Sequence, residues 1–183
     1  MKETSGDGTR GRPRDEAARR ALLDAAYALV VKHGYAKVSM DAIAAEAGSG
    51  KQTIYRWWSG KAELVLDALE DWAETEINIV EPESVAVFLR KVCEGASRAG
   101  PVLRSLMAEA QFDPELRQRL KLRLIEPRRE AFRRCLMHAG IKAKHRDGLV
   151  LAVYGALWYR LLLDEPLDAG FVGQMTTLVK AVS

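Results

Sequence analysis

The chain has 183 residues, of which 48 % are hydrophobic and 29 % are charged, a composition that provides a packed core for one domain or two small ones. The net charge of +3 is unevenly distributed, because residues 1–61 contain eleven Lys or Arg and seven Asp or Glu, whereas residues 62–183 contain seventeen and eighteen. This positive excess predicts an anionic partner for the N-terminal third alone.

Hydropathy argues against a membrane-spanning segment. The longest apolar run, residues 149–163, is interrupted by Arg160 and falls short of the roughly 20 residues that a span needs. No N-terminal apolar stretch resembles a signal peptide. Cys93 and Cys135 lie within helical patterns, so we expect buried thiols in a reducing compartment rather than a disulfide, and a cytoplasmic protein.

The N-terminal 34 residues predict a polar arm followed by a helix. Residues 1–14 are rich in Gly and Arg and show no hydrophobic periodicity, so we expect a disordered basic arm. From Asp15 to His33, apolar residues recur with helical spacing. Gly34 then ends the helix.

Residues 39–61, SMDAIAAEAGSGKQTIYRWWSGK, predict two short helices around a glycine turn. Ser39 is a candidate N-cap, and Gly48 stands where the first helix must end. The tip of the second helix carries Lys51 and Gln52, which can reach a phosphate or a base edge, while Ile54 points inward. This is the shape and chemistry with which a protein places a helix in the major groove of DNA. A helical hairpin with a solvated polar face is the alternative.

The fragment GSGKQT, residues 48–53, resembles the end of a phosphate-binding loop. The full motif requires a Gly five residues before the Gly-Lys pair and a Ser or Thr directly after the Lys. Ala45 and Gln52 occupy those positions, and an alanine-rich helical segment precedes the fragment instead of a buried strand. A nucleotide-binding loop is therefore rejected.

The remaining two thirds of the chain are helical in pattern. A long helix is expected from about Ala62 to Ile77, followed by a linker over residues 78–83. Further helices are predicted over residues 84–99, 102–112, 115–139 and 146–163, and from Asp168 onward. Pro127 should kink or split the third of these, and the helix over 146–163 is apolar nearly all round, so we expect it to be buried on most sides. No segment shows sustained two-residue alternation, so the predicted fold class is all-α.

The N-terminal third resembles the DNA-binding domain of the TetR family of transcriptional regulators. The matching residues are the first helix ending in HGY, then VSMDAIAAEAG, KQTIYRWW and SGKAEL, over roughly residues 17–69. The resemblance implies a three-helix helix-turn-helix domain over 15–61, joined by a long helix to a helical ligand-binding and dimerisation domain over 62–183. The family often has Ser as the N-cap of the recognition helix, whereas Gly50 occupies that position here, with Ser49 available to share the role.

The resemblance also implies which residues contact DNA. Lys51 and Gln52 are the expected base readers, and Tyr55, Arg56, Trp57 and Lys61 the expected phosphate contacts. Trp58 takes the place of a core aromatic, whereas Trp57 could serve as core filler or as a contact. The complete expected interface in this region comprises Ser39, Met40, Ser49, Gly50, Lys51, Gln52, Thr53, Tyr55, Arg56, Trp57 and Lys61.

The basic arm adds a separate hypothesis. TRGRPR places Arg10, Arg12 and Arg14 around a Gly-Arg-Pro core, an arrangement that resembles a minor-groove hook. The alternative, which we favour slightly, is a solvated basic tail that attracts DNA without sequence preference.

The C-terminal part is expected to convert the binding of a small-molecule effector into a change of helix spacing. Candidate lining residues are Trp72, Phe88, Cys93, Met107, Phe112, Trp158 and Tyr159, although ordinary core packing is the better prediction for any one of them. The last two helices are expected to form a homodimer interface, at which Gly155 and Ala156 allow close approach.

The sequence therefore predicts a dimeric, sequence-specific DNA-binding regulator. The resemblance to the family further implies a ligand-responsive repressor that binds a palindromic operator. The main alternative is a ligand-independent architectural DNA-binding protein. An enzyme is not expected, because His33, His138 and His145 lack metal-ligand spacing and no nucleophile–base arrangement can be argued. No cofactor or metal is predicted.

Overall fold

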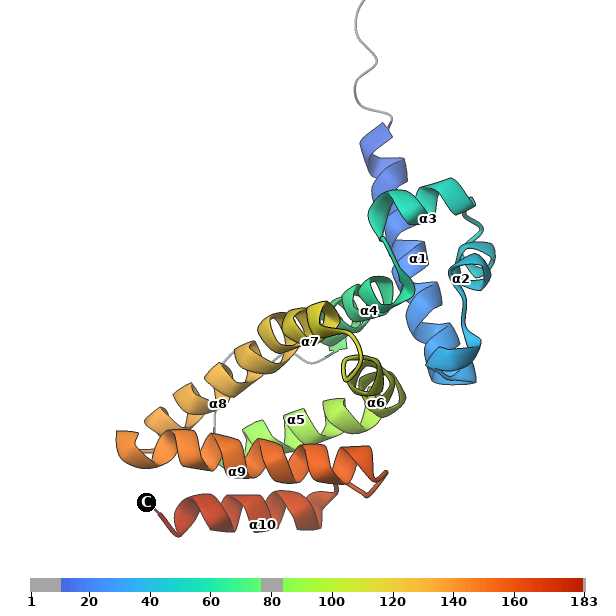
Figure 1. Cartoon of the computed structure of the whole chain (residues 1–183). Coiled ribbons are helices and arrows are strands. Elements are labelled where there is room, and N and C mark those ends of the chain that lie inside the picture. Colours follow the sequence, from blue (N-terminus) through green and yellow to red (C-terminus); the bar gives the residue numbers. More distant parts are fainter. Residues whose placement is uncertain (1–10, 77–83, 183) are drawn as a thin grey trace, which may run out of the picture.

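In a computed structural model, which describes residues 11–76 and 84–182, every regular element is a helix, so the predicted all-α class is confirmed (Figure 1). The first bundle contains α1 (Gly11–His33), the short 3-10 turn η1 (Tyr35–Lys37), α2 (Met40–Glu46) and α3 (Lys51–Trp57). The helix α4 (Lys61–Glu76) joins it to a second bundle. That bundle contains α5 (Val85–Arg98), α6 (Gly100–Glu109), α7 (Pro114–Leu120), the π-helical turn η2 (Lys121–Ile125), α8 (Glu126–His138), α9 (Ala143–Leu162) and α10 (Ala169–Lys180). No helix in these ranges is long and apolar enough to span a membrane.

The helix α1 begins before the position that the sequence indicated. Residues 11–14, which we expected in a disordered arm, form its first turn, and residues 1–10 lie outside the described residues. Pro13 fits this turn because the first four N–H groups of a helix have no intrahelical acceptor, so a residue without an N–H removes no bond. The start of α1 predicted from the polar composition, Asp15, is therefore four residues later than the observed start, Gly11.

The two bundles share one continuous apolar core. Ile43 of α2, Ile54 of α3 and Trp58 are almost fully buried against α1, and Leu64 and Leu66 extend this core along α4. The helix α4 packs along α1 on one side and reaches α6 and α7 on the other. The residues predicted as a linker, 78–83, lie outside the described residues.

The predicted kink at Pro127 takes the form of a π-helical turn. The segments α7, η2 and α8 follow one another without a break, and the wider turn over Lys121–Ile125 lies immediately before the first turn of α8, where Pro127 stands. Pro127 cannot donate to the carbonyl one turn earlier, and a π turn absorbs this missing bond without ending the helix. The helix before it begins at the predicted cap, because the Asp113 side chain accepts from the N–H groups of Glu115 and Leu116.

The helix α9 is less buried than its composition suggested. One side packs into the core through Val150, Val153 and Leu157, but Leu151 and Tyr159 are 64 % and 63 % exposed on the opposite side. The prediction of burial on most sides is therefore wrong for the single chain, because no other helix within residues 11–76 and 84–182 covers that side. Figure 1 draws α9 and α10 at the end of the molecule farthest from α2 and α3.

Candidate nucleic-acid interface and ligand cavity

The turn between α2 and α3 is built by local backbone chemistry. The Ser39 hydroxyl accepts from the N–H of Ala42 at 3.1 Å, which confirms the predicted N-cap of α2. Gly48 adopts a φ of +60°, a conformation that favours glycine. The N–H of Gly48 donates to the carbonyl of Ala45, and the N–H of Ser49 donates to the carbonyl of Ala44 at 2.8 Å. This pair of bonds is a Schellman motif, and it fixes the angle at which α3 leaves α2.

The helix α3 presents one apolar and one polar face. Ile54 is fully buried, whereas Lys51, Gln52, Tyr55 and Arg56 are exposed. Because residues three and four positions apart share a helix face, Lys51 and Tyr55 lie one above the other, and Gln52 and Arg56 form the neighbouring row. The exposed face therefore carries two cations, an amide and a phenol in a compact group.

Of the two residues predicted to cap α3, Gly50 occupies the N-cap position and Ser49 lies beside it. Gly50 holds the extended N-cap conformation, with φ −78° and ψ 151°, and its carbonyl accepts from the N–H of Thr53 at 3.0 Å. Ser49 and Thr53 are half-buried at the edge of the exposed face. Gly50 contributes no side-chain cap, so the tip of α3 keeps free N–H groups that point outward.

Both cations of this face are paired with carboxylates. Lys51 Nζ lies 2.7 Å from Asp41 Oδ2, and Arg56 Nη2 lies 2.7 Å from Asp15 Oδ1. The hydrogen bond to Asp41 raises the pKa of Lys51 above its ordinary value, so the ammonium is charged. Any anionic partner of this face must compete with these two acids for the cations.

Two of the residues expected to contact DNA have contacts within the protein instead. Met40 is only 8 % exposed, so its side chain belongs to the core and the predicted DNA contact is corrected. Lys61 donates from Nζ to the carbonyl oxygens of Tyr35 and Val38, at 2.8 and 2.9 Å, and burial lowers its pKa. Two of its three N–H donors therefore hold the start of α4 against η1, and one remains for a phosphate.

The two adjacent tryptophans have different environments. Trp58 is 2 % exposed, which confirms it as a core aromatic. Trp57 is 38 % exposed and lies between the guanidinium groups of Arg19 and Arg56, at 5.9 and 5.6 Å from its ring centre. These cation–π contacts hold two positive charges beside α3.

The predicted arginine arm falls mostly outside what can be described. Arg10 lies outside the described residues, and Arg12 and Arg14 are on the first turn of α1. The minor-groove hook and the solvated tail both remain hypotheses for residues 1–10.

Asp67 of α4 joins the first bundle to the second. Its Oδ2 accepts from the indole N–H of Trp58 at 2.9 Å and lies 3.6 Å from Arg19 of α1. Its Oδ1 accepts from Arg123 of η2 at 2.8 Å, and Arg123 also binds Glu70. This carboxylate thus links the end of α3 to the π turn, a contact that no sequence pattern indicates.

The start of α4 is fixed by a second carboxylate. Glu63 accepts from both the N–H and the hydroxyl of Ser59, at 3.1 and 2.8 Å, and its other oxygen lies 2.7 Å from Arg119 of α7. Burial alone would raise the pKa of the Glu63 carboxyl, but the hydrogen bonds from Ser59 and the charge of Arg119 hold it below its ordinary value. Glu63 is therefore ionised in the folded protein near neutral pH.

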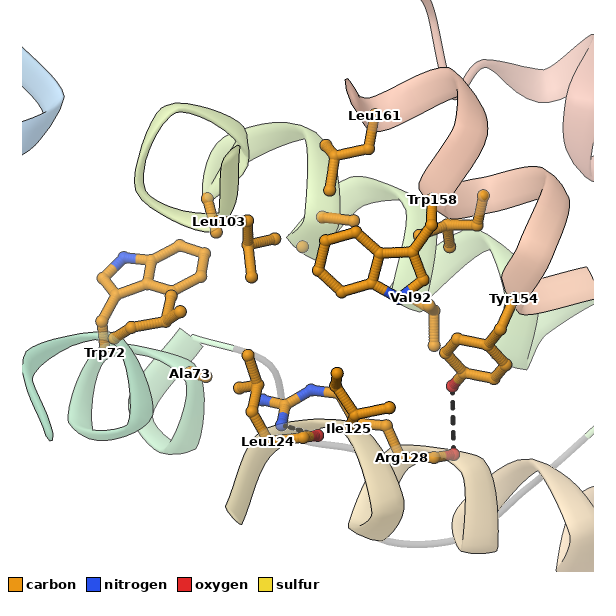
Figure 2. Close-up of a pocket in the computed structure, with 15 residues that line it drawn as sticks. Trp72, Ala73, Val92, Leu103, Leu124, Ile125, Arg128, Tyr154, Trp158 and Leu161 are labelled. Carbon is orange, nitrogen blue, oxygen red and sulfur yellow. Dashed lines mark hydrogen bonds between the residues drawn. The ribbon is translucent and has the colours of Figure 1, made fainter. Parts of the chain in front are cut away.

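The second bundle encloses a cavity between α4, α5, α6, α8 and α9, with about 590 Å³ between protein atoms when its open mouth is included (Figure 2). Trp72 and Trp158 face it from α4 and α9, and Arg128 enters from α8. The Tyr154 hydroxyl at its edge donates to the Arg128 carbonyl at 3.0 Å, and burial raises the pKa of this phenol. The rest of the lining is largely apolar and includes Leu69, Leu103, Leu124, Ile125, Leu157 and Leu161.

The structure corrects much of the predicted lining. Trp72 and Trp158 do line the cavity, whereas Phe88 and Cys93 are buried in the core and Met107 packs against that core. Phe112 and Tyr159 are 90 % and 63 % exposed, so neither lines it. Sequence reasoning missed two polar contributors, Arg128 and Tyr154, because helical periodicity does not reveal which inward position meets an empty space.

Sequence comparison finds two family models in this chain. The model of the bacterial regulatory proteins of the tetR family matches residues 22–68, and that of the tetracyclin repressor-like C-terminal domain matches residues 84–179. The first match ends within α4, and the second begins directly before α5.

Individual proteins match over most of their length. The uncharacterized HTH-type transcriptional regulator YdeS of Bacillus subtilis is 34 % identical over 172 residues, which cover 87 % of each chain. The DNA-binding transcriptional repressor TetR of Mycobacteroides abscessus is 30 % identical, over 88 % of this chain and 91 % of the relative. Among solved structures, the TetR family transcription regulator SCO0332 superposes with a TM-score of 0.71 at 27 % identity, over 91 % of this chain and 98 % of that one.

Proposed function

Because the chain belongs to the TetR family of bacterial regulatory proteins, and so is a DNA-binding transcriptional regulator, we propose that it is a ligand-responsive repressor that binds a palindromic operator as a homodimer. The observation that carries the proposal is the exposed face of α3, with Lys51 and Gln52 at its tip and Ile54 anchoring its other side. DNA as the target implies action in the cytoplasm.

Base reading is assigned to Lys51 and Gln52. Both stand on the first turn of α3, from which long polar side chains reach a base edge in the major groove. Tyr55, Arg56 and Trp57 are assigned to phosphates, since they lie further along the helix and give affinity more than sequence choice. Lys61 contributes one phosphate contact with its remaining donor and holds the start of α4 with the others.

The dimer interface is assigned to the outer side of α9 together with α10. Gly148, Leu151, Ala152, Gly155 and Tyr159 are exposed at helical spacing along α9, a stripe in which small residues allow a second helix to approach closely. On α10, Leu178 is also exposed. In light scattering, we expect a dimer at micromolar concentration and a monomer for Leu151→Glu. Leu122→Glu, at an exposed leucine of η2, should remain dimeric, and a monomeric unmodified chain would refute this interface.

We assign the response to ligand to α4, because this helix both lines the cavity and contacts the first bundle. It contributes Leu69 and Trp72 to the cavity, and it carries Asp67 and Lys61 to the first bundle. A ligand that binds one position of α4 better than another changes the spacing of the two recognition helices, which must be about 34–36 Å apart to enter successive major grooves. A cavity of this kind has no role in a purely architectural DNA-binding protein.

Selection of bound fragments from a random DNA pool tests the proposal. We expect an inverted repeat whose half-sites are about one helical turn apart, or a multiple of that distance. Lys51→Ala should weaken binding to the selected site and relax the preference at one base pair of each half-site. Lys144→Ala removes an exposed cation at the start of α9 and serves as the matched control. Recovery of sequences without a shared motif would refute sequence-specific recognition.

A further inference from the structure

Among the described residues that line the cavity, a single side chain is charged, and it is a cation. Arg128 is half-buried, and its Nη1 donates to the carbonyl of Leu124 at 2.8 Å, as Figure 2 shows. The other lining residues are apolar apart from Tyr154 and the two indoles, and none of them is acidic. Burial lowers the pKa of Arg128, yet an arginine remains charged in proteins.

Arg128 differs from the arginines around it. Within the described residues, every other arginine between positions 119 and 134 has a carboxylate within 4 Å, namely Arg119, Arg123, Arg129, Arg133 and Arg134. Arg128 has none, so its only polar partner there is the Leu124 carbonyl. A half-buried guanidinium without a counter-ion carries a desolvation cost that an anion can offset.

The acids nearest to Arg128 lie on its other side. Glu70 and Glu74 of α4 border a separate groove that Arg128 also reaches, and their charges favour its ionised form. Glu70 already binds Arg123 through one oxygen, while its other oxygen is buried without a hydrogen-bond partner. Glu70 is therefore the internal competitor for Arg128.

Most of the hydrogen-bonding capacity in the cavity lining is donor capacity, although the Tyr154 hydroxyl, whose hydrogen is donated to the Arg128 carbonyl, can still accept. Arg128 retains most of its five N–H groups, arranged in a fork that matches a carboxylate. The indole N–H of Trp158, also donor-only, has no acceptor in the described part of the chain. Trp72 stacks on Tyr27, with ring centres 5.0 Å apart, and its indole contributes to the cavity wall together with that of Trp158. A lipophilic cation could contact the aromatic rings of this cavity, but the positive charge of Arg128, which has no paired carboxylate in the described residues, would repel it.

We propose that this cavity binds an organic carboxylate with a hydrophobic body, whose acid group pairs with Arg128 while its body lies between Trp72 and Trp158. The inference rests on the proposed function, in that the same cavity is taken as the effector site. It adds the ligand's charge and shape, which follow from the guanidinium of Arg128, the donor-only indole N–H of Trp158 and the apolar remainder of the lining.

Two sets of matched probes test the ligand class. 2-Naphthoate, 2-naphthamide and 2-naphthylmethylamine share a ring system, and octanoate, octanamide and octylamine share a chain, while the head group is anionic, neutral or cationic. Isothermal titration calorimetry on the full-length protein should show that at least one carboxylate binds about tenfold or more tighter than its amide, with the amine weakest. Equal or tighter binding of the amide or amine would overturn the proposal, and so would the absence of carboxylate binding at millimolar concentration in both sets.

Substitutions assign the preference to Arg128. Arg128→Met keeps the length and packing of the side chain and should abolish the preference for the carboxylate, whereas Arg128→Lys should retain part of it. Arg134→Met removes an arginine that pairs with Glu130 outside the cavity, so it should leave the preference unchanged. A preference that survives Arg128→Met in a folded protein, as judged by circular dichroism, would refute the assignment.

A DNA-release assay separates this inference from the proposed function. If the carboxylate binds through Arg128 but leaves DNA affinity unchanged, the ligand class is supported and the regulatory role of the cavity fails. If a neutral or cationic probe instead releases the DNA, the regulatory role is supported and the carboxylate inference fails.

Discussion

Replacement of Asp67 by Ala should destabilise the protein far more than an ordinary loss of a surface charge. The indole N–H of Trp58, whose side chain is 2 % exposed, would lose its acceptor, which costs about 1–3 kcal/mol. The ion pairs to Arg19 and Arg123 involve partly exposed arginines, so each adds only about 0.2–1 kcal/mol. The expected total is about 1.4–5 kcal/mol.

Thermal and urea unfolding measure this loss at a fixed protein concentration, because the proposed dimer would make stability concentration-dependent. For a chain of this length, about 1.4–5 kcal/mol corresponds to a fall in Tm of roughly 3–20 °C. Asp67→Asn keeps an oxygen acceptor for Trp58 and should recover most of the loss, leaving a deficit of about 1 kcal/mol.

The matched control is Asp71→Ala, one turn further along α4. Asp71 forms an ion pair with Arg20 at 2.9 Å, but it accepts no bond from a buried indole. Its loss should cost no more than about 1 kcal/mol. If Asp67→Ala lowers the free energy of unfolding by no more than Asp71→Ala does, the hydrogen bond to Trp58 does not stabilise the connection between α3 and α4, and the reasoning is refuted.

Three further outcomes are expected. Folding lowers the pKa of Glu63, so the stabilisation that this carboxylate contributes is present above the unfolded pKa of about 4.3 and is lost as the pH falls through the folded pKa. The unfolding free energies of the unmodified protein and of Glu63→Gln should therefore converge on acidification from about pH 7 to pH 3. A gap that does not narrow as the pH falls would contradict this. Cys93 and Cys135 are 2 % exposed, and burial raises the pKa of each thiol to about 11, so a thiol reagent at neutral pH should label them only after addition of denaturant. Rapid labelling of the folded protein would show that the core opens readily. Asp41→Asn releases Lys51 and removes a negative charge beside the α3 face, so DNA affinity measured by fluorescence anisotropy should rise by about two- to tenfold at low salt. An unchanged affinity would show that the ion pair does not compete with DNA.

The features that the sequence determined are those fixed by a few neighbouring residues. Ser39 caps α2 through a bond to a residue three positions away, and Gly48 takes a backbone conformation that few other residues tolerate. The turn, the polar tip of α3 and the inward position of Ile54 therefore follow from local geometry and helical period. Asp113 with Pro114 likewise marked the start of α7 correctly.

Tertiary structure decided everything that depends on which distant side chains meet. Helical periodicity places both Phe88 and Trp158 on inward faces, but only the packing of five helices determines that Trp158 borders empty space while Phe88 stacks on Phe132. The same holds for charge, because Lys61 and Arg128 look alike in the sequence as exposed cations. Folding leaves Lys61 bonded to two carbonyls, whereas Arg128 has no carboxylate within 4 Å among residues 11–76 and 84–182. The energy of a charge depends on the partners and the solvent that remain around it.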